Sequence, residues 1–113
     1  MTNITVSNAV SADELREMSS NTYRLINVNK TVSEMLEFAF TRLTKAVEKN
    51  KTSVKFDFTK ALYNKWIEGI KPETLEKVHN RFADYLESQG YDVEDVLDMD
   101  EDEVLENTVT VSW

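Results

Sequence analysis

The sequence has no cysteine, a single proline, two glycines and a single histidine. Without cysteine, disulfide bonds, a thiolate nucleophile and a cysteine-ligated zinc site are excluded. Two isolated glycines cannot form the Gly-rich loop that cradles a phosphate or a dinucleotide. A catalytic dyad or triad would have to use His79, the one histidine, and no nucleophile motif surrounds it. We therefore expect no enzymatic activity and no cofactor.

Long hydrophobic runs are also absent. No apolar stretch approaches the ~20 residues that a helix needs to cross a bilayer, and the first ten residues lack the basic start and apolar run of a secretion signal. We expect one domain over residues 1–113, in the cytoplasm and without membrane contact. Residues 1–10 alternate only loosely, which predicts either an edge strand or a flexible arm that orders against something else.

Positive charge is missing from one segment. Residues 92–106 hold nine acidic residues and no basic one, while the other 12 of the 21 acidic residues are matched by 13 Lys and Arg. The net charge of −8 therefore comes from this segment. Such a surface disfavours nucleic acid as a direct partner, because binding to phosphates relies on cations that displace counterions. It favours a protein partner with a basic surface.

The clearest structural signal is a helix over residues 31–50. Thr31 and Glu34 predict a capping box at its start, and Asn50 predicts a left-handed cap at its end. Its apolar residues recur at steps of three and four, as one stripe along a helix requires. They are Val32, Met35, Leu36, Ala39, Leu43, Ala46 and Val47. The other elements are predicted to cover this stripe.

The remaining elements follow from periodicity and from the turn residues. Alternation predicts strands, apolar steps of three and four predict helices, and the two glycines end the later helices. The expected elements are a short helix over 12–20, a strand over 52–59, a short helix over 60–70, a helix over 72–89, and strands over 91–97 and 108–113. The last two strands should pair antiparallel, with the acidic segment 92–106 as their connection. The predicted fold is α+β: a small, three-stranded, mostly antiparallel sheet covered by two long helices and one or two short ones.

Three short segments mark the junctions of these elements: Lys49-Asn50-Lys51, Gly90-Tyr91-Asp92-Val93 and the closing Ser112-Trp113. A helix that runs through a basic turn into a strand, then a helix and a terminal strand, resembles the small accessory proteins of tailed bacteriophages. The resemblance covers residues 31–113 and is one of pattern. It implies a host-directed or virion-associated protein that acts in the cytoplasm of the host cell, and it carries no catalytic residues.

Two groups of side chains have the residue types that metal binding or acid–base chemistry uses. Asp98, Asp100 and Asp102 repeat at the spacing that opens an EF-hand loop. However, Glu103 occupies the position that needs glycine, and Val109 the position of the bidentate glutamate. We therefore predict no dedicated metal site. His79 is expected at the core boundary, with local hydrogen bonds.

The acidic segment carries the main functional prediction. Runs of charge are usually solvated connections. However, Val93, Leu97 and Val104 are interleaved with these acids, which indicates a structured segment that holds its charges in fixed places. Ordered carboxylates can also imitate the phosphates of a nucleic acid and occupy a cationic groove. The residues expected to match charge with a partner are Asp98, Asp100, Glu101, Asp102 and Glu103.

Surplus aromatic side chains suggest a second contact. Large rings usually fill a small core. Phe38 and Phe40 flank the main stripe on opposite sides, and we expect Phe38 or Trp66 to serve as an apolar anchor in an interface. The sequence therefore predicts a non-enzymatic inhibitor or modulator that occupies a basic surface on a host or defence protein, as a monomer or homodimer. The alternative is a virion structural or assembly protein that self-associates through the aromatic patch.

Overall fold

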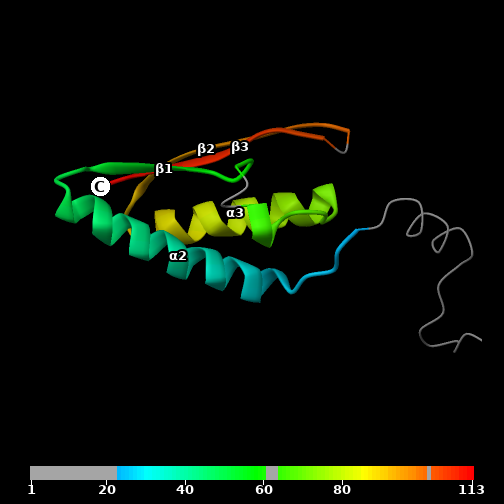
Figure 1. Ribbon diagram of the computed structural model, residues 1–113, viewed down its shortest axis with the longest axis horizontal. Coiled ribbons are helices and arrows are strands. Elements are labelled where there is room, and N and C mark those ends of the chain that lie inside the picture. The colour runs from blue at the N-terminus through cyan, green and yellow to red at the C-terminus, as the bar shows by residue number, and fades with distance from the viewer. Residues whose placement is uncertain (1–22, 61–63, 102) are drawn as a thin grey trace, which may run out of the picture.

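The computed structural model describes residues 23–60, 64–101 and 103–113. It has two layers, with a sheet on one side and both long helices on the other (Figure 1). The elements are α2 (Val28–Glu48), β1 (Ser53–Asp57), the 3₁₀ turn η2 (Asn64–Trp66), α3 (Pro72–Ser88), β2 (Asp92–Asp100) and β3 (Glu103–Ser112). This confirms the predicted α+β class with its small three-stranded sheet. The predicted helix over 12–20 and the arm over 1–10 lie outside the described residues.

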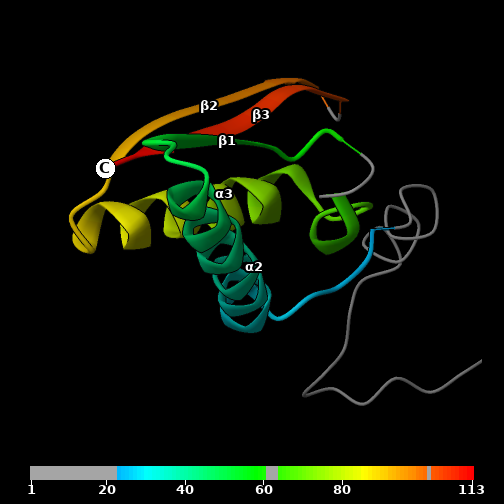
Figure 2. The ribbon, with the colours of Figure 1, turned by 60° about the vertical axis from the view of Figure 1, so that its left-hand side comes forward.

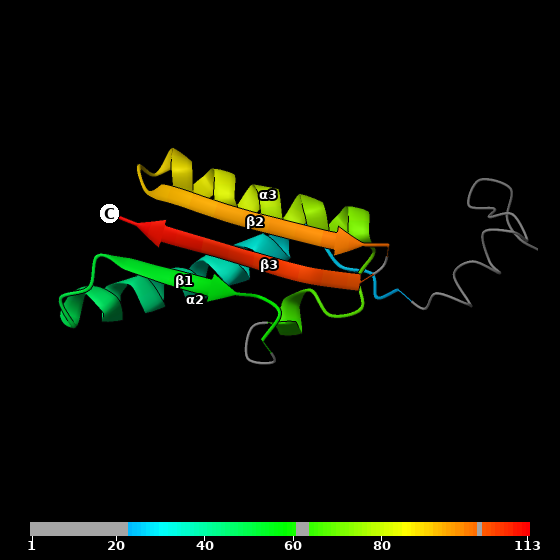
Figure 3. The same cartoon turned by 90° about the horizontal axis from the view of Figure 1, so that it is seen from above.

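The sheet has the strand order β1-β3-β2, and both pairings are antiparallel. The last strand of the chain therefore lies in the centre, between the other two (Figure 3). Thr110 of β3 pairs with Lys55 on one side and with Glu94 on the other, so these three residues share one row and one face. The predicted antiparallel pairing of the last two strands is confirmed.

Helix α2 begins one turn earlier than the sequence predicted. Asn27 is the N-cap, and its side-chain oxygen accepts a hydrogen bond from the Lys30 backbone N–H over 3.1 Å. The expected capping box at Thr31 and Glu34 is wrong, because Asn27 is an equally good cap and the following residues tolerate helical geometry. Thr31 is instead buried inside the helix. At the other end Asn50 has φ 59°, which confirms the left-handed residue after the helix.

The predicted helix over 60–70 is replaced, in the part that is described, by the single turn η2. Arg24 explains part of this difference. Its guanidinium donates to the backbone carbonyls of Lys65 and Glu68 over 3.2 and 2.9 Å, and its backbone N–H donates to that of Gly69 over 2.6 Å. These carbonyls are therefore occupied by a segment from before α2. Gly69 then adopts φ 74°, which ends the turn.

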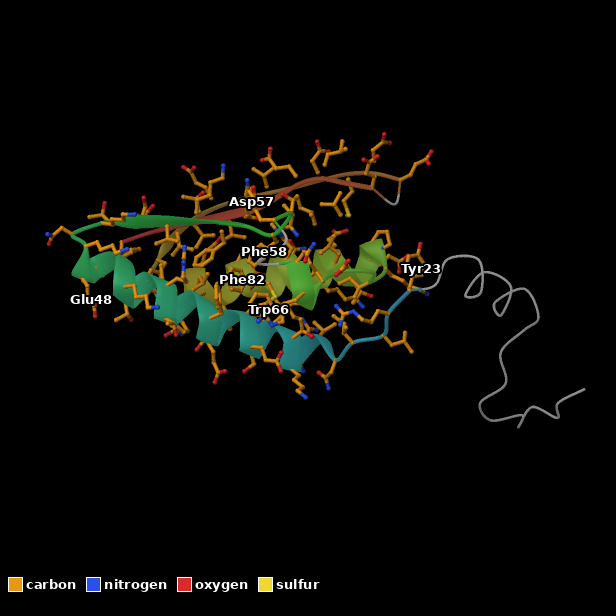
Figure 4. The ribbon with its side chains drawn as sticks, viewed as in Figure 1. Tyr23, Glu48, Asp57, Phe58, Trp66 and Phe82 are labelled. Atoms are coloured by element: carbon orange, nitrogen blue, oxygen red, sulfur yellow. The ribbon has the colours of Figure 1, made fainter. Side chains whose placement is uncertain are left out.

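The core lies between the sheet and the two helices (Figure 2). Three phenylalanines from two segments meet there: Phe56 and Phe58, in β1 and directly after it, pack edge-on against Phe82 of α3, with ring centroids 6.1 and 5.4 Å apart. Figure 4 shows Phe58 and Phe82 between the layers and Asp57 on the opposite side of the sheet. Such edge-to-face pairs add to the burial of large apolar surfaces. Helix α3 begins with proline at its first turn, as predicted, and Gly90 follows its end with φ 93°.

The largest departure from the prediction concerns the acidic segment. It was expected to be a connection between two short strands. Instead, β2 continues to Asp100 and β3 starts at Glu103, so the segment consists mainly of the two paired strands. The reason lies in the interleaved apolar residues: Val93, Leu97 and Val104 pack against the core, and this favours extended pairing over a loop. The hairpin reaches well beyond the end of β1 (Figure 3).

Candidate binding surfaces

The open face of the sheet is where the hairpin displays its acids. Alternate residues of β2 point to opposite faces: Val93, Leu97 and Met99 pack against the core, while the residues between them are exposed. Asp95 is the exception, because it lies on the covered face and reaches a buried histidine. In the part of the chain that the structure describes, no helix covers the open face (Figures 1 and 3). The hairpin acids on this face are Asp92, Glu94, Asp98 and Asp100 from β2, and Glu103 and Glu106 from β3.

Two pairs of these acids stand directly opposite each other. Asp98 pairs with Glu106, and Asp100 pairs with Glu103, on the two sides of a register shift that leaves Leu105 without a cross-strand partner. Like charges directly opposite in an antiparallel pair are destabilising. The outer end of the hairpin therefore concentrates negative charge at a cost in stability. A solvating loop would not incur this cost, because its charges could move apart.

The structure thus brings together four of the five predicted charge-matching residues. Asp98 and Asp100 end β2, Glu101 lies in the turn with φ 55°, and Glu103 begins β3. Asp102, the fifth, lies outside the described residues. Glu106 was not among the predicted residues, although its place opposite Asp98 adds it to the group. Its contribution follows from the strand register, which the sequence does not state. We call Asp98, Asp100, Glu101, Glu103 and Glu106 the acidic tip.

The predicted apolar anchors, by contrast, pack mainly on each other. The rings of Phe38 and Trp66 meet edge-on with their centroids 5.4 Å apart, and the Lys65 ammonium lies 4.6 Å from the centre of the indole. Only 8% of Trp66 is exposed, and Phe38 is half-buried against the core. Trp66 was expected as an apolar anchor in an interface, but the structure buries nearly all of its surface in the core. A structural role accounts for both rings.

A different aromatic surface is exposed, and the sequence pointed to only one member of it. Phe40, on the other flank of α2, lines two adjoining grooves of about 370 and 260 Å³. The first lies between the two long helices and includes Tyr85; the second includes Tyr91 and Trp113. Tyr85 and Trp113 are 43% and 41% exposed. We call these four residues the aromatic groove. Tyr85 and Trp113 were missed because they join Phe40 only through tertiary packing.

His79 forms a buried polar cluster rather than a local contact at the core boundary. Its Nδ1 lies 2.8 Å from the Asn107 side-chain oxygen on β3, and its Nε2 lies 2.8 Å from an Asp95 carboxylate oxygen on β2. The carboxylate oxygen of Asp95 can only accept here, so Nε2 is placed to donate to it, while Nδ1 faces the Asn107 amide. Both ring nitrogens are therefore engaged by groups of the protein itself. The cluster therefore ties α3 to both hairpin strands, and the expected local hydrogen bonds are corrected.

The acidity of Asp57, on the open face at the end of β1, is changed by its neighbours. The Thr59 hydroxyl, 2.5 Å from Oδ1, and the Thr59 backbone N–H lower the pKa of Asp57, with smaller help from Lys60 and Lys55. Partial burial opposes this effect. Among the residues described, no three His, Cys, Asp or Glu side chains come together in a way that would hold a metal ion. Asp98 and Asp100 lie in a strand rather than in an EF-hand loop.

Comparisons with protein-family models, with curated proteins and with solved structures gave no match for this chain. Within the described residues, neither long helix is apolar over enough of its length to span a membrane. The arguments about function therefore depend on the surfaces described above.

Proposed function

We propose that this protein is a non-enzymatic binding protein whose acidic tip occupies a basic surface on another protein. The observation that carries the proposal is the cross-strand pairing of like charges, Asp98 with Glu106 and Asp100 with Glu103. A cationic side chain placed between such a pair would relieve the repulsion. The tip is thus more stable when it is bound than when it is free, which is a property expected of a docking surface.

The arrangement also suits imitation of a nucleic acid. Charges on alternate residues of one strand lie about 6.5–7 Å apart, in a regular row of negative charge such as a nucleic-acid strand presents with its phosphates. The charged row lies on a rigid hairpin whose other face is anchored by His79 and by apolar side chains. A groove that normally holds phosphates would therefore meet preorganised carboxylates. In the cytoplasm of an infected host, such a protein would inhibit or modulate a host or defence protein.

The test is affinity capture from a bacterial host lysate with three proteins: wild type, a tip variant and a matched control. The tip variant carries Asp98→Asn, Asp100→Asn and Glu103→Gln, and the control carries Glu34→Gln, Glu73→Gln and Asp84→Asn, which remove the same charge from exposed helical positions. We expect wild type and control to capture the same basic protein, and the tip variant to lose it. Binding by the captured protein, once purified, should weaken with salt.

Retention of the same partner by the tip variant at high salt would contradict the proposal. If the control variant also failed to capture the partner, the loss would be due to net charge and not to the acidic tip. Thermal unfolding of all three proteins checks that the substitutions leave the fold intact.

The aromatic groove favours a second candidate, an assembly protein that associates with itself. Tyr85 and Trp113 expose large apolar surfaces beside Phe40, and rings of this kind are enriched in interface cores. Here Tyr85→Ser together with Trp113→Ser should convert an oligomer of defined size into a monomer, as measured by sedimentation velocity. Substitutions at the acidic tip should leave that oligomer unchanged.

A further inference from the structure

The two edges of the sheet carry opposite charge. Beside β1, a groove of about 270 Å³ runs between this strand and the second half of α2. No carboxylate is among the residues that line it, while five cations are: Arg42, Lys45, Lys49, Lys51 and Lys55. We call this surface the basic edge. It is a local excess of positive charge on a chain whose net charge is −8, and neither the acidic tip nor the aromatic groove includes it.

The opposite edge is acidic in both layers. In the sheet layer, Asp92 and Glu94 are exposed on β2, which forms this edge. In the helix layer, Glu76 and Glu87 are exposed on α3. They stand eleven residues apart, which is close to three helical turns, so they share a flank. That flank is opposite to Tyr85, which lines the groove facing α2. We call these four residues the acidic edge.

Both edges also have open backbone groups. The Trp113 backbone N–H donates to the Thr52 carbonyl over 3.1 Å, and the Phe58 N–H donates to the Asn107 carbonyl over 2.8 Å. Thr52 and Phe58, on either side of β1, therefore use these backbone groups toward β3 and its end. Because such bonds alternate along an antiparallel pair, the N–H and C=O of Lys55, between them, point away from β3. The same alternation directs the backbone of Val93 away from the sheet at the other edge. Each edge strand is therefore able to accept one more strand.

From this arrangement we propose that the basic edge binds the acidic edge of a second copy of this chain, with β1 of one copy extending the sheet beside β2 of the other. Lys55 and Glu94 already share a row across the sheet through Thr110. A copy shifted sideways by one sheet width therefore places its Lys55 beside Glu94. In the helix layer, Lys45 and Lys49 near the end of α2 approach Glu87 near the end of α3, because both helices end beside the same end of the sheet.

Two copies could meet through a basic and an acidic edge, through two basic edges or through two acidic edges, and charge selects the first of these contacts. Like edges would bring lysines to lysines or carboxylates to carboxylates, and repulsion of this kind is how proteins protect their sheet edges. Only the basic-to-acidic contact is attractive. Because the contact joins two different surfaces, it does not close on itself as a two-fold dimer does, so it propagates along a row of copies. A nucleic acid is a poorer occupant, because none of the lining residues is aromatic and could stack a base.

The inference stands independently of the acidic tip, because Asp98 to Glu106 extend beyond the part of β2 that faces β1 in the row. The experiment uses sedimentation velocity of the full chain over a range of concentrations, in about 0.15 M and about 1 M salt, where the Debye length falls from about 8 to about 3 Å. Wild type should form species larger than a dimer that grow with concentration, and high salt should dissociate them.

Two charge-reversed variants test the geometry. The first, Lys49→Glu with Lys55→Glu, removes the basic edge; the second, Asp92→Lys with Glu94→Lys, removes the acidic edge. Each variant alone should self-associate at least about tenfold more weakly than wild type, because attraction at the contact becomes repulsion. Mixed together, the two variants should recover assemblies larger than a dimer, because the two intact edges attract each other and the two reversed edges do so as well. The matched controls are Lys30→Glu with Lys77→Glu, and Glu34→Lys with Glu68→Lys, all at exposed positions.

Four results would overturn the inference: a wild type that stays monomeric at both salt concentrations, an assembly that stops at a dimer, an assembly that survives both reversals, and equal loss of assembly in the controls. Binding of an added acidic peptide at the basic edge, without self-association, would also overturn it in favour of a foreign partner. Binding of a single-stranded oligonucleotide there would replace it with a nucleic-acid site.

Discussion

The two faces of the sheet differ in what their residues do. On the covered face, Phe56, Phe82 and His79 are buried, and packing or hydrogen bonds hold each of them. On the open face, the acids of the hairpin are exposed, and Asp98 and Glu106 face each other with the same charge. The buried groups of one face therefore contribute stability, whereas the like-charged pairs of the other reduce it. This difference is the basis of the proposal that the open face contacts another molecule.

The largest effect should come from the covered face. His79→Ala leaves the Asn107 side chain without its partner and removes a charge-assisted bond to Asp95. We expect a loss of about 2–4 kcal/mol in the free energy of unfolding, measured by urea denaturation. Asp95→Asn, which keeps a polar group in place and is partly exposed, should cost less. A change within about 0.5 kcal/mol for His79→Ala, the range of ordinary surface substitutions, would show that the cluster is not a structural tie.

A smaller effect, of opposite sign, should come from the open face. Asp98→Asn removes one member of the like-charged pair with Glu106. The protein should become more stable by about 0.2–1 kcal/mol, and the gain should shrink as salt screens the repulsion. Asp84→Asn on α3 is a control of equal charge change. If both substitutions stabilised equally, the gain would reflect the net charge of −8 and not the cross-strand pair.

The smallest effect concerns Asp57, on the same open face but held by Thr59. Because the pKa of Asp57 is lowered in the folded protein, its stabilising contribution is present above the unfolded pKa. That contribution is lost as the pH falls below about 4 and through the folded pKa. Its size should be under about 1 kcal/mol, since the group is partly exposed. In the Asp57→Asn variant, the free energy of unfolding should therefore fall less steeply as the pH decreases below about 4. An unchanged limb would show that the contacts with Thr59 do not persist in solution.

The sequence predicted well those elements whose signals are local. The apolar stripe of α2, the proline and glycine that bound α3, and the alternation in β1 all reflect neighbours in the chain, and the structure confirms each element. Predictions failed where a distant residue intervened. Arg24 takes the carbonyls of the segment around Lys65, and Asn107 and Asp95 reach His79 across the layers.

The candidate surfaces divide in the same way. The acids of the tip were identified from composition, because a run of nine carboxylates without a base is visible in any linear reading. Their cross-strand pairing was not, since it depends on a register shift near Asp98. The sequence does not separate a core role from an interface role for Trp66, because a large aromatic residue suits both; the structure buries this residue. Tyr85 and Trp113 come from separate elements and form one surface only through packing.

By itself the sequence determined the α+β class, the absence of cysteine chemistry and the location of the negative charge, because these depend on composition and on periods of two and 3.6 residues. Only the tertiary structure decided that the charged segment is a hairpin, that His79 joins three elements, and that opposite charges collect at the two sheet edges. The physical reason is that strand pairing and helix packing bring together residues dozens of positions apart, and local patterns do not encode which ones meet.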